Sequence, residues 1–365
     1  MRNLFTLSLT LVLCFQFSFA KADRKADFQV AYLGYQQAIS ANDIPAAIKS
    51  AERSYEIGSK LYGKDNINTA KLALNYAALL NDTEEFRKAR KVMKGKLAVM
   101  ESRYEEFAVD LIAPLMELAR AEFNAKKPNK SLEYFERVSF IVSKQDNALY
   151  RAMKNTEIAT TLLNRGGRAH ARPYTQAAYT DYANTLQPRD VRLGTASYQM
   201  ALWAQQDRDL GAVVDYSNAA LAAFHREGSM NQAERYARLL LVDALSQEGR
   251  DDEATPHCVV LGEYKDASEP LTALFVVPLD IEREQLREAR GKAINVDFTV
   301  DAQGFVINPR IMSSTVDGLD EVALAAISQF RYAPRFVDGE PVVTTNVHYT
   351  FDISREGRMG RVRNR

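Results

Sequence analysis

The fold of the C-terminal part is decided by the stretch KAINVDFTVDAQGFVINPRIMSS (292–314), DGLDEVALAAISQ (317–329) and FRYAPRFVDGEPVVTTNVHYTFDI (330–353). The first piece holds two runs of alternating apolar and polar residues, joined by a turn that contains Gly304. The second piece has the apolar spacing of a helix, and the third ends in another alternating run. The sequence therefore predicts a small α+β unit with the order ββαβ, whose last strand lies at a sheet edge.

The alternation also predicts which side chains of this unit are buried. In the first strand Ile294, Val296, Phe298 and Val300 share one face. On the second strand we expect the buried face to continue through three residues, and on the last strand through five: Phe305, Ile307 and Ile311, then Val343, Val347, Tyr349, Phe351 and Ile353. Asp317 is the expected N-cap of the helix.

The order and spacing of SS after the second strand, LDEVALAAI in the helix and FRYAPRFVDGEPV before the last strand resemble the C-terminal domain of TonB. The resemblance covers 279–354 and implies an exposed strand that accepts an extended peptide from an outer-membrane receptor or another envelope protein. The implied partner-binding residues are Thr344, Asn346, His348 and Thr350. The same edge could instead be covered by the C-terminal tail, by the preceding helices or by a second copy of the domain.

Residues 27–264 alternate helix-length apolar patterns with short polar breaks. The pattern recurs about every 40 residues and gives about six helix pairs. A helix with a single apolar stripe buries that stripe only against a neighbour, so the pairs are expected to stack into an all-α solenoid. The pairs are predicted to begin near Asp27, Ile67, Phe107, Ala148, Arg189 and Asn231.

These units resemble tetratricopeptide repeats, in the longer form found in kinesin light chains. The likeness rests on an apolar residue that opens the second helix and a small residue three positions later, as in Ile44 with Ala47 and Phe86 with Ala89, and on Ala254 in the last unit. The resemblance implies a groove for a protein segment, lined by first-helix residues. The candidates are Tyr32, Asn75, Arg120 and Gln199, each of which could equally be an ordinary solvated helix position.

Residues 1–22 combine an early cation, Arg2, with an apolar run and small residues near Ala20 and Ala22. This pattern predicts a signal peptide and therefore export, with an uncleaved membrane anchor as the alternative. If the segment is removed, Cys258 is the only cysteine that remains. No intramolecular disulfide is then possible, so the exported chain must be stabilised by packing.

The formal net charge is zero, with 47 basic and 47 acidic residues. A chain without a net field is not expected to bind nucleic acid. The four histidines have no metal-ligand spacing, and no phosphate-binding loop or nucleophile motif is present in the sequence. We therefore expect no cofactor, no metal and no enzymatic activity. The tail 355–365 is basic and is predicted to be a solvated end.

Together these patterns predict an exported, periplasmic, non-enzymatic adaptor that binds protein partners with its helical repeats and with its C-terminal domain. Membrane contact is expected only through partners or through an uncleaved N-terminus. The alternative is an energy transducer of the TonB type, anchored in the inner membrane. Such a transducer needs a long Pro-rich spacer, whereas the 11 prolines of this chain are scattered. An envelope hydrolase whose site forms only in three dimensions is a third class.

Overall fold

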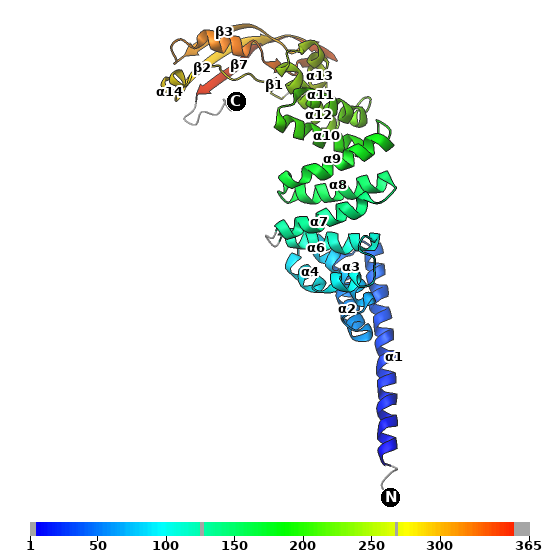
Figure 1. Ribbon diagram of the computed structural model, residues 1–365. Helices are drawn as coiled ribbons and strands as arrows, with labels where there is room; N and C mark the ends of the chain where they lie inside the picture. The colour runs from blue at the N-terminus through cyan, green and yellow to red at the C-terminus, as the bar shows by residue number, and fades with distance from the viewer. Residues whose placement is uncertain (1–4, 125–127, 267–268, 354–365) are drawn as a thin grey trace. The chain divides into compact units, whose positions relative to one another are not determined.

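The computed structural model describes residues 5–124, 128–266 and 269–353 (Figure 1). The described chain divides into two compact units, with the boundary between Ala178 and Tyr179. Of the predicted signal peptide, residues 1–4 are outside the described part and residues 5–22 begin a helix whose side chains are not described there. The basic tail 355–365 is also outside it.

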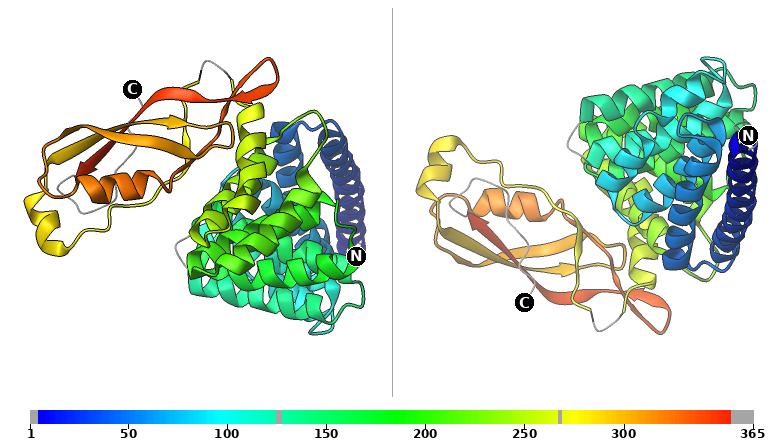
Figure 2. Two further views of the ribbon diagram at one scale, coloured as in Figure 1. Left: turned by 90° about the horizontal axis from the view of Figure 1, so that it is seen from above. Right: turned by 90° about the horizontal axis from the view of Figure 1, so that it is seen from below.

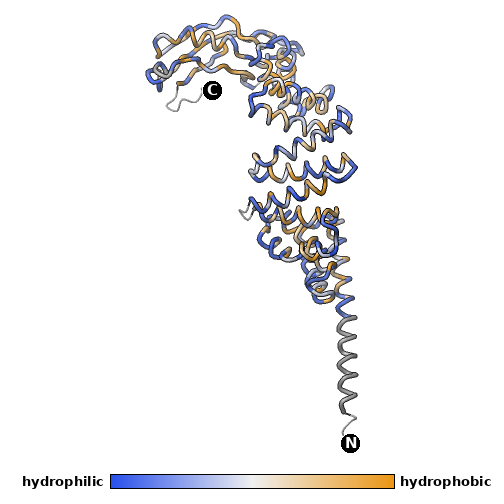
Figure 3. The backbone as a smooth tube through the Cα atoms, viewed as in Figure 1, coloured by the Kyte–Doolittle hydropathy of each residue, from blue (hydrophilic) through white to orange (hydrophobic). Residues whose placement is uncertain are grey.

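The first unit consists of helices, in which the described residues mix apolar and polar positions along the chain (Figure 3). Consecutive helices contact one another from α1 to α4 and from α6 to α8. The elements are α1 (Phe5–Ser40), α2 (Ile44–Tyr62), α3 (Ile67–Asp82), α4 (Phe86–Met93), α5 (Lys96–Glu101), the short 3-10 helix η1 (Val109–Leu111), α6 (Ile112–Asn124), α7 (Pro128–Ser143), α8 (Ala148–Asn164) and α9 (Arg168–Thr185), which ends in the second unit.

The second unit continues with antiparallel helix pairs, in which α10 contacts α11, α11 contacts α12 and α12 contacts α13. These helices are α10 (Val191–Asp207), α11 (Leu210–Phe224), α12 (Gln232–Gln247) and α13 (Asp251–Glu263). The all-α repeat region that the sequence predicts is therefore present.

Small residues and capping side chains explain why these helices begin and pair where they do. Ala47, Ala89 and Ala254 are completely buried, as a close approach of the two helices of a pair requires. Among the helices whose caps are described, six begin after an Asp or Asn whose side chain accepts a hydrogen bond from a first-turn amide. These residues are Asp43, Asn66, Asn147, Asp190, Asp209 and Asn231.

The C-terminal part of the second unit has the predicted ββαβ order around a three-stranded antiparallel sheet, β3–β2–β7. Helix α15 lies along one face of this sheet and contacts β2 and β3 (Figure 2). The elements are β1 (Ala273–Phe275), α14 (Arg283–Glu288), β2 (Lys292–Val300), β3 (Val306–Ser314), α15 (Asp320–Ile327), β4 (Arg331–Tyr332), β5 (Arg335–Val337), β6 (Glu340–Val342) and β7 (Thr344–Ile353). Short ladders pair β1 with β4 and β5 with β6.

The predicted buried face is confirmed on β2, where Ile294, Val296, Phe298 and Val300 are all buried. It is wrong at Ile307 of β3, which is exposed, whereas the neighbouring Val306 is buried. It is also wrong at Val343, which is 55% exposed and precedes β7. Asn308 and Asn346 have positive φ and lie where the register of β3 and β7 shifts. A one-residue shift transfers side chains to the opposite face, which explains both errors.

The helix start that the sequence assigned to Asp317 is a further correction. Helix α15 begins at Asp320, and its N-cap residue is Leu319, which makes no side-chain cap hydrogen bond. Leu319 is instead buried in the core between helix and sheet. Burial of an apolar residue has taken precedence over capping at this helix start.

The C-terminal sheet region is bound to the last helix of the repeats by a buried guanidinium. Arg331 is 1% exposed, and its Nη1 and Nη2 atoms donate to Asp251 Oδ1 and Thr255 Oγ1 of α13, both at 2.8 Å. The guanidinium also lies 3.7 Å from the centre of the Phe305 ring. Since a buried charge is tolerated only with such partners, Arg331 is expected to hold α13 in a defined position.

Gly262 of α13 lies where this helix packs closely against the backbone at Pro334 in the C-terminal sheet region. A Cβ atom at this position would lie 2.3 Å from the carbonyl oxygen of Pro334. We expect Gly262→Ala to destabilise the second unit by about 1–3 kcal/mol because the backbone of the segment 333–335 must move. Trp203, the single tryptophan, is buried in this unit, so its fluorescence during urea unfolding measures the change.

Gly211→Ala in α11 is the matched control, since the nearest heavy atom to its Cβ would be 3.9 Å away. This substitution should stabilise the helix by about 0.5 kcal/mol. Equal stability of the two variants would contradict the close packing of α13 against Pro334.

Candidate protein-interaction sites

Strand β7 is an edge of the three-stranded sheet. It pairs with β2 from Lys292↔Ile353 to Val300↔Thr344, and no other described strand pairs with it. In a strand with one neighbour, alternate backbone N–H and C=O groups point away from the sheet and have no ladder partner. The outer side of β7 therefore has the hydrogen-bonding groups that an added strand needs.

A bulge limits the usable part of this edge. Asn346 has a φ of 56°, and the register with β2 shifts between Phe298 and Val300. From Val347 to Ile353 the register is constant. A bulge interrupts the regular row of backbone groups, so the segment from Val347 to the end of β7 is the part that can pair continuously.

The other edge strand, β3, differs in the features that prevent strand addition. Pro309 has no backbone N–H, and Asn308 next to it has a φ of 52°. The register between β3 and β2 shifts at two places. Proline and bulges are the usual protections of sheet edges, so β3 is a poor acceptor and β7 is the open side of the sheet.

An aromatic cluster in the core between α15 and the sheet packs against β7. Phe330 lies 4.9 Å from Tyr349 and 5.9 Å from Phe351, measured between ring centroids, and Tyr349 and Phe351 are 4.8 Å apart. Burial raises the pKa of the Tyr349 hydroxyl, so this side chain stays neutral. This edge-to-face packing supports the part of β7 that contains Tyr349 and Phe351.

On the exposed face, side chains at directly opposed positions bond across all three strands. Asn295 of β2 donates to Ser313 of β3 at 2.9 Å and accepts from Thr350 of β7 at 2.7 Å. In the next row Asp297 accepts from Nδ1 of His348 and lies 3.6 Å from a guanidinium nitrogen of Arg310. We call these the amide row (Ser313, Asn295, Thr350) and the charged row (Arg310, Asp297, His348).

The residues predicted at the sheet edge all lie on β7, but they have different surroundings. His348 and Thr350 end the two rows with exposed side chains, and Asn346 is the bulge residue. Thr344 is half-buried before the bulge, and its hydroxyl has no hydrogen-bond partner among the described residues. The regular edge therefore contains two of the four, His348 and Thr350.

The four predicted groove residues are not brought together in one compact unit. Tyr32 on α1, Asn75 on α3 and Arg120 on α6 belong to the first unit, whereas Gln199 on α10 belongs to the second. Tyr32 stacks on Phe28 with 5.9 Å between ring centroids, so its ring takes part in packing. Arg120 is bound to the carboxylates of Glu117, at 3.1 Å, and Asp82, at 2.5 Å.

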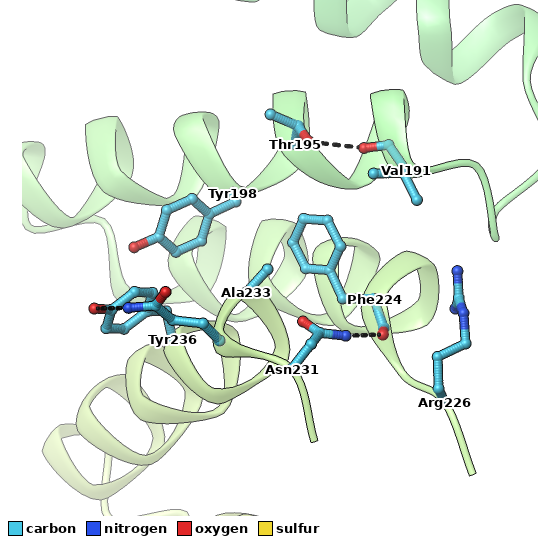
Figure 4. Close-up of a pocket in the computed structure, with 9 residues that line it drawn as sticks. Val191, Thr195, Tyr198, Phe224, Arg226, Asn231, Ala233 and Tyr236 are labelled. Atoms are coloured by element: carbon cyan, nitrogen blue, oxygen red, sulfur yellow. Dashed lines mark hydrogen bonds between the residues drawn. The ribbon is translucent and has the colours of Figure 1, made fainter. Parts of the chain in front are cut away.

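A pocket that the sequence did not predict lies in the second unit between α10 and α12 (Figure 4). Its volume is about 540 Å³ and its lining is mainly apolar. Tyr198 and Tyr236 stack with centroids 6.5 Å apart, and Arg226 stands at one side. The pocket is lined by Val191, Thr195, Tyr198, Phe224, Arg226, Asn231, Gln232, Ala233 and Tyr236. Tyr198 lies on α10 and Tyr236 on α12, so the apolar spacing within each helix does not predict that the two rings are in contact.

A buried ionic cluster holds the helices beside this pocket. Oε1 of Glu234 accepts from Arg238 Nη2 at 2.7 Å and lies 2.9 Å from Nδ1 of His225, the C-cap residue that follows α11. Burial disfavours the charged form of Glu234, but the hydrogen bonds from Arg238 and His225 outweigh it and lower the pKa. Arg238 also bonds His257 of α13 at 3.2 Å. The cluster therefore connects the end of α11 with α12 and α13.

His257 makes the free energy of unfolding of the second unit depend on pH. Burial, with a smaller contribution from the Arg238 charge, lowers the pKa of His257 from 6.5 to about 4. Between these values the unfolded chain binds a proton that the native state does not, so stability falls as the pH drops from 6.5 to 4. We expect a loss on the order of 2 kcal/mol over this window, and His257→Gln should reduce it.

Urea unfolding followed by Trp203 fluorescence at several pH values measures this effect. His170→Gln, at an exposed position, is the control and should behave like the parent chain. A His257→Gln variant whose stability falls as steeply as that of the parent would show that another group causes the loss.

Comparisons with known proteins found a matching family model and similar solved structures. The family model of the Gram-negative bacterial TonB protein C-terminal matches residues 282–353. Among solved structures, BtubC of P. vanneervenii is similar with 14% identity and a TM-score of 0.41, covering 64% of this chain and 87% of that chain. A Podosopora anserina protein assigned as a kinesin light chain with nearly identical TPR-like repeats has 16% identity and a TM-score of 0.42, covering 53% of this chain and 92% of its own.

No curated protein matches the sequence. Within the described ranges no helix has both the length and the apolar character needed to cross a membrane. The same ranges contain no group of three or more His, Cys, Asp or Glu side chains that could hold a metal ion.

Proposed function

We propose that this chain is a non-enzymatic adaptor of the Gram-negative cell envelope, located in the periplasm, whose C-terminal domain binds an extended segment of a partner protein by strand addition to β7. The observation that carries the proposal is the continuous register of β7 from Val347 to Ile353, with no strand among the described residues on its outer side. The match of residues 282–353 to the TonB C-terminal family supports a protein-interaction role in a TonB-related context.

Strand addition fits the physical properties of this edge. Each backbone hydrogen bond between β7 and a docked strand would contribute about 1 kcal/mol, whatever side chains the strand has. The rigid support below β7, given by Phe330, Tyr349 and Phe351, means that the edge need not be ordered when a partner binds. An outer-membrane receptor or another envelope protein with an exposed extended segment would be a suitable partner.

The repeats supply the second binding surface of the proposed adaptor. The pocket beside Tyr198 and Tyr236 is apolar, concave and large enough for one or two bulky side chains. Stacked tyrosines are effective anchors at protein interfaces because each offers a large rigid surface. We propose that the protein partner of the helical repeats in this unit binds in that pocket.

Crosslinking in intact cells tests the proposal. A photoreactive side chain at Asn346, next to the regular edge, should capture the partner segment. Proline at an outward-facing position of β7 should reduce the captured fraction by about ten-fold, because the docked strand loses a hydrogen bond and meets the proline ring.

Val347→Pro and His348→Pro are two separate single variants that are compared with each other. Neighbouring residues of a strand direct their N–H groups to opposite sides, so only one of the two variants loses an outward N–H. The variant that keeps the parent melting temperature is the one that has lost an outward N–H, and it should lose capture. Val343→Pro, which precedes β7, is the matched control and should retain it. Full capture by the stable β7 variant would exclude strand addition.

A further inference from the structure

The amide row and the charged row of the exposed face end on β7 with atoms that have no partner among the described residues. The hydroxyl of Thr350 donates its hydrogen to Asn295 Oδ1, so the lone pairs of Thr350 Oγ1 are open. In the charged row Nδ1 of His348 is bound to Asp297, and its Nε2 is open. The His348 side chain is 72% exposed, so a neighbouring strand can reach it.

The amide row has a direction. Thr350 on β7 donates to Asn295 on β2, and Asn295 donates to Ser313 on β3. A strand added outside β7 would continue the row by donating to Thr350 Oγ1, and chains of hydrogen bonds that run in one sense strengthen one another. The position opposite Thr350 therefore favours a side chain that donates.

The position opposite His348 has a different requirement. With Nδ1–H bound to Asp297, the neutral ring accepts a hydrogen bond at Nε2, whereas the protonated ring donates one there. A hydroxyl or a carboxamide can do either. A carboxylate suits only the protonated ring and an ammonium only the neutral one.

We propose that the segment bound by β7 is an amphipathic strand that presents a side chain able to donate a hydrogen bond opposite Thr350. Opposite His348 it presents an uncharged side chain able both to donate and to accept, namely Ser, Thr, Asn or Gln. Its other face is apolar, because the intervening residues of β7, Tyr349 and Phe351, are buried on that side. This inference rests on the proposed function and specifies its partner. The basic tail of this chain, REGRMGRVRNR, does not have this pattern.

A tethered probe strand tests the inference in the full chain. Residues 354–365 are replaced by Asn-Gly and an alternating polar and apolar strand, because a two-residue turn fixes the hairpin register with β7. The probe carries Thr, Val, Glu or Lys opposite Thr350, and hydrogen exchange of the probe amides, followed by mass spectrometry, measures how much of it is docked. Tethering gives a high effective concentration, so a weak preference is measurable.

We expect the Thr and Lys probes, which can donate to Thr350 Oγ1, to dock more strongly than the Val and Glu probes, by about two- to five-fold in the docking equilibrium constant. The preference over Val should disappear in Thr350→Val, which keeps the shape of the side chain and removes its oxygen. A second series, with Thr, Glu or Lys opposite His348, should favour Thr, and His348→Phe should abolish that preference.

The outcomes are distinguishable. If no probe is protected, β7 does not accept a strand and the proposed function fails as well. If all probes dock equally, or Thr350→Val leaves the preference unchanged, strand addition stands and this inference is overturned. The unmodified chain could also form dimers that are lost in Val347→Pro or His348→Pro. This result would show that a second copy of the chain occupies the β7 edge, and it would likewise overturn the inference. Protection of β7 that disappears when the native tail is deleted would show that the tail occupies it, with the same consequence.

Discussion

One constraint underlies the rest of the structure: among the described residues, β7 pairs with a strand on one side only, namely with β2. Soluble proteins usually protect such an edge, and here the opposite strand β3 is protected by Pro309 and by two register shifts. In β7 the bulge stands at Asn346, before the regular segment rather than within it. Because of this difference between the two edges, β7 is the edge to which we propose that a partner strand is added.

An open edge is useful only if the strand behind it does not move. The aromatic cluster of Phe330, Tyr349 and Phe351 fixes β7 from below, and Arg331 fixes the adjoining segment to α13 through Asp251 and Thr255. The last helix pair and the sheet therefore belong to one compact unit. For this reason the C-terminal domain is unlike a module on a flexible linker, and the pocket and the β7 edge share one scaffold.

Periodicity in the sequence predicted the features that depend on local spacing alone. The buried face of β2, the helix α15, the order of strands and the small residues between paired helices, such as Ala47, all result from apolar spacing. Spacing could not reveal the bulges at Asn308 and Asn346, because asparagine also occurs in ordinary strands and turns. Both bulges exchange the two faces, and Ile307 and Val343 were misplaced for that reason. The pocket joins Val191 with Tyr236, and Arg331 joins Asp251, so both depend on contacts between residues far apart in the sequence.

Hydrogen exchange of the β7 amides in the full chain tests the central claim most directly. In the absence of a partner, alternate amides between Val347 and Ile353 should exchange within seconds to minutes, while those bonded to β2 are protected. On addition of a binding segment, the fast amides should become protected as well. Protection of every β7 amide in the isolated monomeric chain would contradict the account, because the edge would then already be paired.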